Sequence, residues 1–80
     1  MPNAMITVRL FAAAADVVGT KQLNLEATSV ADVIAHLSDA QTTTKVISRC
    51  SFLVDGTRAT PDTALASGAT VDVLPPFAGG

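Results

Sequence analysis

The fold is decided by residues 28–37, which read TSVADVIAHL. The hydroxyl of Ser29 can accept a backbone N–H at a helix start, and Asp32 follows three residues later, as in a capping box. The apolar residues beyond recur at helical spacing and form one stripe, made of Val30, Val33, Ile34 and Leu37. Such a stripe must be covered by another layer, and the surrounding sequence predicts that this layer is a sheet.

Strand patterns flank the helix on both sides. Apolar and polar residues alternate before it, and after it a short apolar run leads into Asp55-Gly56, a dipeptide typical of two-residue hairpin turns. The strand patterns cover residues 6–10, 21–27, 51–54, 57–59 and 70–74. We therefore expect an α+β two-layer sandwich, with one main helix across one face of a mixed sheet of four or five strands.

Three other segments carry weaker signals. Residues 11–18 are rich in alanine and end at Gly19, which tolerates the left-handed conformation of a helix end, so they predict a short helix. Residues 61–65 begin with proline and predict a single helical turn. Residues 38–48 contain three consecutive threonines and few good helix formers, so we expect a loop with at most a frayed turn at its end.

Length and charge restrict the classes of function. Eighty residues suffice for one domain, expected at residues 5–74, with an extended tail at residues 75–80. Residues 1–4 precede a second methionine and are interpreted as a tag or an alternative start. The net charge is −2 and the five basic residues are scattered, which argues against nucleic acid as a partner.

The sequence also predicts where in the cell the protein is found and which side chains are structural. It has no apolar run approaching the ~20 residues of a membrane span and no secretory signal, so we expect a cytoplasmic protein with no membrane partner. The single cysteine, Cys50, is interpreted as a small apolar residue rather than a reactive thiol. His36 lies on the flank of the main helix and has no second histidine to form a metal site with.

The C-terminal residues predict the chemistry. Pro75-Pro76 stops ladder pairing and favours an extended exit from the sheet, so that six residues reach about 20 Å at roughly 3.3 Å each. Gly79-Gly80 carries no side chains and can enter a narrow channel. A chain-terminal carboxylate is ionised at neutral pH. Gly80 could therefore attack the α-phosphate of ATP held by a partner, giving an acyl-adenylate that a sulfur donor converts to a thiocarboxylate.

Several short motifs occur together in this chain: Leu10-Phe11-Ala12, Val17-Val18-Gly19-Thr20, Asp55-Gly56, the turn at Gly68, and Leu74-Pro75-Pro76-Phe77-Ala78-Gly79-Gly80. In this combination the sequence resembles the small subunit of molybdopterin synthase, the MoaD-like branch of the MoaD/ThiS family of ubiquitin-like sulfur carriers. The resemblance covers nearly the whole chain from Met5. It implies a β-grasp fold with a flexible C-terminal Gly-Gly tail.

The resemblance also implies partners. An E1-like, MoeB-like enzyme would adenylate Gly80 with Mg-ATP, and a cysteine desulfurase or a rhodanese would supply sulfur. The tail would then enter a MoaE-like large subunit of a heterotetrameric synthase and donate sulfur to a pyranopterin precursor. The acid-base groups are expected on that large subunit, and this chain is expected to bind no cofactor or metal itself. The implied partner-binding residues are Pro75, Pro76, Phe77, Ala78 and Gly79.

Other functions stay open. The same carrier chemistry could serve thiazole synthesis for thiamine, or cysteine synthesis. A protein modifier would join Gly80 to lysines through the same adenylate. A plain interaction domain would need no reactive terminus. Of the basic residues, Arg9 and Arg58 are candidates for pairing with acidic groups of an adenylating enzyme.

Overall fold

The computed structural model describes residues 5–38 and 41–76, with only the backbone described at residues 41 and 42. The predicted tail residues 77–80 and the N-terminal residues 1–4 lie outside these ranges. In chain order the elements are β1 (Met5–Leu10), α1 (Ala13–Val18), β2 (Gln22–Glu26), α2 (Val30–Leu37), α3 (Gln41–Ile47), β3 (Ser51–Val54), β4 (Thr57–Ala59) and β5 (Thr70–Leu74).

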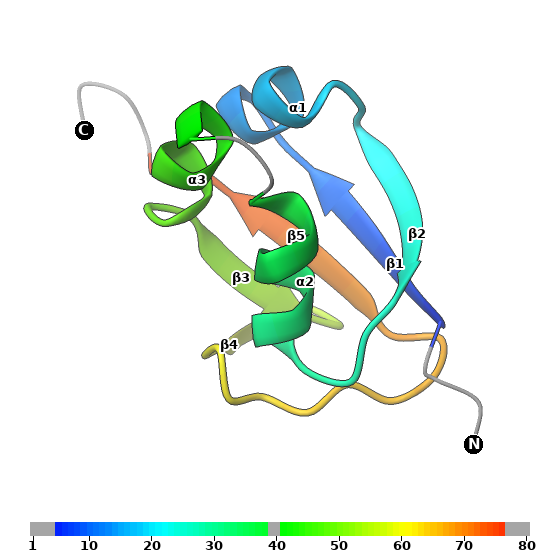
Figure 1. Ribbon diagram of the computed structural model, residues 1–80. Helices are drawn as coiled ribbons and strands as arrows, with labels where there is room; N and C mark the ends of the chain where they lie inside the picture. Colours follow the sequence, from blue (N-terminus) through cyan, green and yellow to red (C-terminus); the bar gives the residue numbers. More distant parts are fainter. Residues whose placement is uncertain (1–4, 39–40, 77–80) are drawn as a thin grey trace.

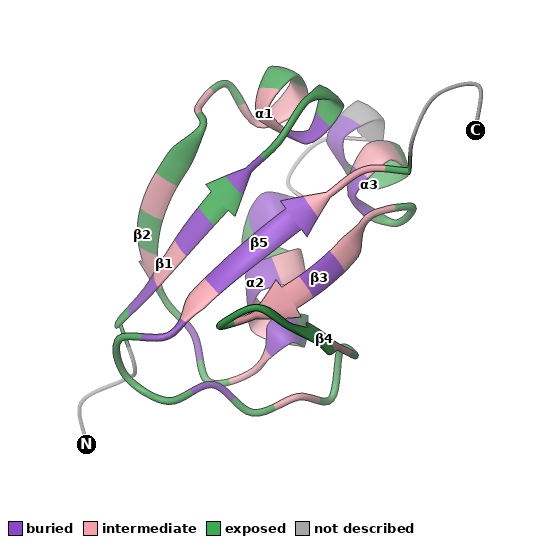
Figure 2. Cartoon of the chain, turned by 180° about the vertical axis from the view of Figure 1, so that it is seen from behind, coloured by how far each residue is buried: buried purple, intermediate pink, exposed green. Residues whose placement is uncertain are grey.

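The five strands form one mixed sheet in the order β2-β1-β5-β3-β4. The central pair, β1 and β5, is parallel, and the other neighbours are antiparallel. The helix α2 crosses one face of this sheet, and the view from behind shows the strands in front of it (Figures 1 and 2). We call the face against α2 the covered face and the opposite one the outer face. The predicted α+β two-layer class is confirmed.

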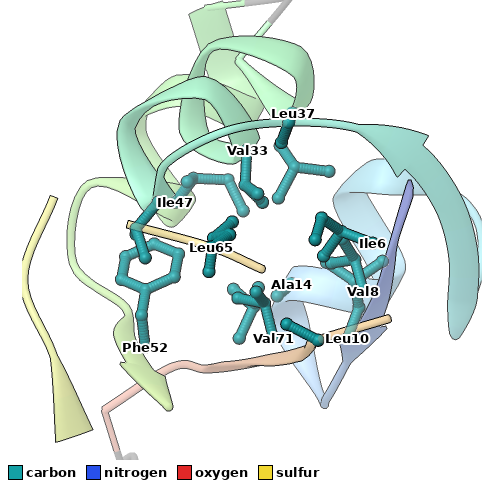
Figure 3. Close-up of a cluster of buried hydrophobic side chains, with 14 residues drawn as sticks. Ile6, Val8, Leu10, Ala14, Val33, Leu37, Ile47, Phe52, Leu65 and Val71 are labelled. Atoms are coloured by element: carbon teal, nitrogen blue, oxygen red, sulfur yellow. The ribbon is translucent and has the colours of Figure 1, made fainter. Parts of the chain in front are cut away.

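The core lies between the covered face and the helices. Ile6 and Val8 of β1 and Val71 of β5 are completely buried, and they meet the α2 stripe residues Val33 and Leu37 in one cluster (Figure 3). Burying a side chain of this size stabilises a fold by about 1.5–3 kcal/mol. The strict alternation of the strands therefore places one apolar set inside and leaves the intervening residues on the outer face.

The start of α2 matches the predicted capping pattern. The Ser29 hydroxyl accepts the backbone N–H of Asp32 at 3.3 Å. The Asp32 carboxylate in turn accepts the Thr28 hydroxyl at 2.7 Å and the Thr28 backbone N–H at 2.9 Å. The bond from the Thr28 hydroxyl is the largest cause of a lowered pKa at Asp32, and the bond from the Thr28 backbone N–H lowers it further.

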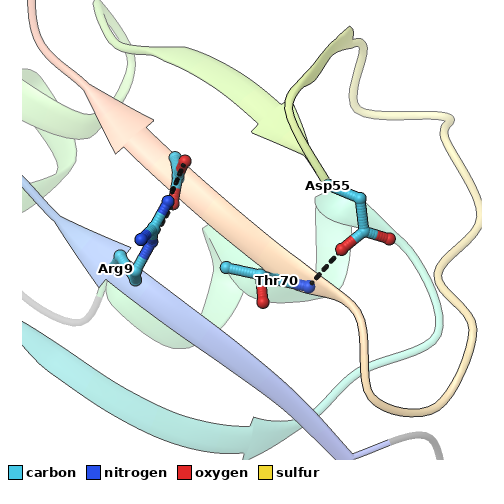
Figure 4. A network of polar contacts seen from close by, with 4 residues as sticks. Arg9, Asp55 and Thr70 are labelled. Carbon is cyan, nitrogen blue, oxygen red and sulfur yellow. Dashed lines mark hydrogen bonds and ion pairs between the residues drawn. The ribbon is translucent and has the colours of Figure 1, made fainter.

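The three predicted glycine turns are confirmed, and the turn at Gly68 has φ 87°. Gly19 ends α1 in the left-handed conformation with φ 93°, and its N–H donates to the carbonyl of Ala15. Asp55 and Gly56 both have positive φ, as a type I′ hairpin turn between β3 and β4 requires. The Asp55 carboxylate also accepts the backbone N–H of Thr70 at 3.0 Å (Figure 4). This bond fastens the hairpin turn to the start of β5.

The expected loop at residues 38–48 is wrong, because residues 41–47 form α3. Local propensity disfavours a helix there, but tertiary packing overrides it. Thr43 and Ile47 are one helical turn apart, both are buried, and α3 packs against α1. The Thr43 hydroxyl also donates to the carbonyl of Val17, at 3.5 Å.

The expected helical turn at residues 61–65 is present only in part: a single tight turn is closed by the N–H of Thr63 donating to the carbonyl of Thr60 at 3.0 Å, and no helix forms. This segment runs beside the start of α2, where Ala64 forms an isolated antiparallel bridge with Ser29. Val30 donates its N–H to Thr63, and Leu65 donates its N–H to Thr28. The N–H groups at the start of α2 lack partners within the helix, and residues 63–65 run alongside them after the turn, with Leu65 buried in the core.

Among the described residues, no helix has both the length and the apolar character required to cross a membrane.

Candidate functional site

The predicted reactive tail leaves the domain from the middle of the sheet. β5 has β1 on one side and β3 on the other, and its last pairing joins Leu74 to Ser51. Pro75 and Pro76 follow directly, and neither has an N–H with which to extend the ladder. The predicted end of pairing at the prolines is therefore confirmed. The implied site residues Phe77, Ala78, Gly79 and Gly80 lie outside the described residues and stay predictions.

An apolar groove of about 650 Å³ adjoins this exit on the outer face. Three parts of the chain form it: the turn before α1, the β3–β4 hairpin and the end of β5. The lining residues are Phe11, Ala12 and Ala13 from the first, Ser51, Leu53 and Arg58 from the second, and Leu74, Pro75 and Pro76 from the third. The two predicted partner-binding prolines are thus part of the groove.

The turn that carries Phe11 has an unusual backbone. Ala12 has φ 51° and ψ −127°, and the N–H of Ala14 donates to the carbonyl of Phe11 at 3.0 Å. This is the second position of a type II′ turn, which glycine normally occupies. An alanine in this conformation stores strain on the order of 1 kcal/mol. The turn leaves Phe11 40% exposed at the edge of the groove.

A row of side chains crosses the outer face of the sheet from β1 through β5 and β3 to β4. Strand register places Arg9 beside Asp72, Asp72 beside Leu53, and Leu53 beside Arg58. Leu53 and Leu74 are therefore apolar residues on the face that α2 does not cover. Two aliphatic side chains at outward positions of a half-buried sheet indicate a contact surface.

Arg9 is held within the domain by a two-point ion pair. Its Nε and Nη2 atoms donate to the two carboxylate oxygens of Asp72 at 2.6 and 2.8 Å (Figure 4). The hydrogen bond and the charge of Asp72 raise the pKa of Arg9. The guanidinium carbon also lies 5.9 Å from the ring centroid of Phe11, within cation–π range. Arg9 thus links β1, β5 and the edge of the groove.

Arg58 has a different environment. It is exposed on the edge strand β4, and its Nη2 lies 3.4 Å from the Ser51 hydroxyl. In the part of the chain that the structure describes, no carboxylate lies within ion-pair distance of Arg58. Of the two arginines singled out from the sequence, Arg9 is paired internally, whereas Arg58 lines the groove and has no ion pair within residues 5–38 and 41–76.

The residues interpreted as structural lie away from the groove. Cys50 is half-buried, its thiol donates to the carbonyl of Val46 at 3.3 Å, and burial raises the pKa of the thiol, which disfavours the reactive thiolate. His36 is exposed on α2. Within the described ranges, no three His, Cys, Asp or Glu side chains gather as a metal site.

Sequence reasoning missed two features of this site. It assigned Asp72 no partner, although alternation places Asp72 and Arg9 on the same face of their strands. It also missed the groove, because Phe11, Leu53 and Leu74 are far apart in the sequence. The available signal was the outward position of Leu53 and Leu74 in otherwise alternating strands.

Comparisons with known proteins agree with this architecture. The chain matches the model of the ThiS family over residues 8–80. Among solved structures, it is similar to the small archaeal modifier protein 1 (SAMP1) of Methanosarcina acetivorans, with a TM-score of 0.83, 26% identity and 100% coverage of both chains. A comparison with curated proteins finds no match.

Two further structures share the fold. SAMP1 of Haloferax volcanii has a TM-score of 0.81 and 24% identity, with 96% of this chain and 100% of that chain covered. A chain of the complex of subunits 1 and 2 of the molybdopterin-converting factor from Helicobacter pylori has a TM-score of 0.72 and 21% identity, covering 95% and 99%. These likenesses confirm the β-grasp fold, and the family match over residues 8–80 shows that the chain belongs to the ThiS family.

Proposed function

We propose that this chain is a ubiquitin-like sulfur carrier whose Gly80 carboxylate is charged by an adenylating enzyme. The observation that carries the proposal is the exit from the sheet. The central strand β5 ends at two prolines beside an apolar groove, and Gly79-Gly80 follows within four residues of Pro76. At roughly 3.3 Å per residue, the terminus can extend about 13 Å into a partner's active site while the partner covers the groove.

The chemistry proceeds in two stages on the terminal carboxyl group. A carboxylate oxygen of Gly80 attacks the α-phosphorus of Mg-ATP on the partner, the bond to the β-phosphate breaks, and pyrophosphate leaves. The terminal sulfur of a donor persulfide then attacks the carbonyl carbon, AMP leaves, and a thiol reduces the resulting acyl disulfide to a thiocarboxylate. The nucleotide and the sulfur donor belong to partners, and this chain supplies the acyl group.

We further propose that the sulfur is used to make molybdopterin. The complex from Helicobacter pylori joins subunits 1 and 2 of a molybdopterin-converting factor, and its likeness to this chain supports a large-subunit, MoaE-like partner. The thiocarboxylate sulfur would attack an electrophilic carbon of the pyranopterin precursor and displace an oxygen substituent from it. Hydrolysis of the resulting thioester would then leave the sulfur on the precursor and release Gly80 as a carboxylate. Synthesis of thiazole or cysteine is the alternative destination for the same sulfur, and a cytoplasmic location is part of the proposal.

A second candidate is modification of proteins. The two SAMP1 structures are named as modifier proteins, and one of them is 26% identical over the full length of both chains. In this function a lysine amine attacks the Gly80 adenylate, or a thioester made from it, and forms an amide. Both functions need the same adenylate, so they differ in the nucleophile that follows.

Intact-mass spectrometry tests the proposal directly. The full chain is incubated with Mg-ATP, a MoeB-like adenylating enzyme and a persulfide donor, and its mass should rise by the difference between one sulfur and one oxygen atom. A chain lacking Gly79 and Gly80 should show no change. Production of molybdopterin after addition of the large subunit supports the first candidate, whereas a ladder of lysine conjugates in cells supports the second. Absence of any AMP release contradicts both.

A further inference from the structure

The two arginines of the outer face differ in what they can offer a partner. Arg9 already donates to both oxygens of Asp72, and that pair adds no net charge beside the groove. Breaking it would leave Asp72, only 8% exposed, without its countercharge. Arg9 is therefore committed to holding β1 and β5 together.

Arg58 has no such commitment among the described residues. It lines the groove together with Leu53, lies on a three-residue edge strand, and its contact with Ser51 is a long bond to a neutral hydroxyl. Its charge can bind an incoming carboxylate without loss of any ion pair that the described residues make. The groove thus combines apolar walls with one positive charge at the β4 side.

The position of the groove restricts its occupant. Pro75 and Pro76 line it, so an enzyme that takes the chain terminus into its active site must lie against it. An apolar segment with an acidic residue at one end complements both the walls and the charge. Adenylation precedes sulfur transfer and protein modification alike, so the adenylating enzyme meets this surface in either function.

We propose that the groove docks an apolar segment of the adenylating enzyme, and that a carboxylate of that enzyme pairs with Arg58 and not with Arg9. Arg58 is in this view a specificity-determining residue for the choice of activating enzyme. This inference rests on the proposed function, since it names the contact through which the carrier is recognised.

The test is the steady-state rate of ATP–pyrophosphate exchange by a purified MoeB-like enzyme with the full chain as substrate. Arg58→Glu should raise the KM for the carrier about tenfold or more and leave kcat nearly unchanged, because a like charge then faces the enzyme's carboxylate. Arg58→Lys should retain most of the affinity. Arg49→Glu, with the same change in charge at an exposed position outside the groove, should stay within about twofold.

The outcomes separate the two proposals. If the unaltered chain supports no exchange, the proposed function fails and this inference fails with it. If it supports exchange but Arg58→Glu and Arg49→Glu behave alike, the inference alone is overturned. The same holds if Arg58→Glu acts on kcat. Matching thermal unfolding curves for the variants establish that a change in KM reflects recognition and not misfolding.

Other occupants of the groove would also overturn the inference. NMR spectra of the full chain and of its Phe77→Ala variant should be the same at Phe11 and Leu53. A change at these residues means that the chain's own tail fills the groove. Sedimentation should show a monomer at all concentrations, and a dimer that Arg58→Glu dissociates would assign the groove to a second copy.

Discussion

The covered and outer faces of the sheet use alternate residues of the same strands for different purposes. In β5, Val71 and Val73 point into the core, whereas Asp72 and Leu74 belong to the outer face. The covered face is completed by α2 within the domain. The outer face carries an apolar groove beside the chain exit, and it carries Arg58, whose guanidinium has no carboxylate partner among the described residues. Neighbouring residues of one strand therefore serve different purposes, so a substitution at one can alter stability and a substitution at the next can alter recognition.

The largest expected difference between the faces is in stability. Ile6→Ala removes a completely buried side chain from the covered face and should lower the free energy of unfolding by about 3 kcal/mol, since the cavity cannot fully collapse. Leu53→Ala truncates a half-exposed side chain of the groove and should cost less than about 1 kcal/mol. Urea denaturation measures both.

The effects of these two substitutions on the KM for adenylation should have the reverse order. Leu53→Ala should raise the KM for the carrier, whereas Ile6→Ala should leave it unchanged at temperatures where the variant is folded. If Leu53→Ala unfolded the domain but left the KM of the folded carrier unchanged, the division between the core and the groove would be contradicted.

An intermediate effect concerns the strained turn at the groove. Ala12→Gly should raise the free energy of unfolding by about 1 kcal/mol, because glycine adopts φ 51° without steric cost. Ala15→Gly makes the same chemical change inside α1 and should lower stability by about 0.5–1 kcal/mol. Thermal unfolding compares the two. If Ala12→Gly also destabilises the domain, the turn is not strained.

The smallest effect concerns the polar cap of α2 and depends on pH. The pKa of Asp32 is lowered in the folded chain, so its stabilising contribution is complete above the unfolded value of about 3.9 and is lost as pH falls through the lower folded value. Asp32→Asn should therefore destabilise the domain at pH 7 and have little effect at the acid end. Ser29→Ala removes a group that does not titrate and should cost about 1 kcal/mol at both pH values. Equal effects of Asp32→Asn at both pH values would contradict the assigned shift.

Sequence patterns predicted the parts of the fold that depend on local rules. The α2 cap, the Gly19 helix end, the Asp55-Gly56 hairpin and the alternating strands all follow from neighbouring residues. α3 could not be predicted because its threonines form a helix only when Thr43 and Ile47 are buried against distant elements. The strand order was likewise beyond local rules.

The candidate site shows the same limit. The end of β5 at Pro75-Pro76 was predictable because proline lacks a donor, wherever it lies in the fold. The groove and the Arg9–Asp72 pair depend on register between β1 and β5, which are some 60 residues apart in the chain. No local pattern indicates which arginine finds an internal partner.

The parallel pairing of β1 with β5 has a consequence for how the protein is made. β5 is the central strand, and β1 and β3 have no common neighbour until residues 70–74 have joined them. A nascent chain that has not yet released this strand from the ribosome cannot close its hydrophobic interior. The strand that leads to the proposed reactive terminus is therefore also the one that completes folding, so an enzyme that recognises the assembled outer face would encounter only folded molecules.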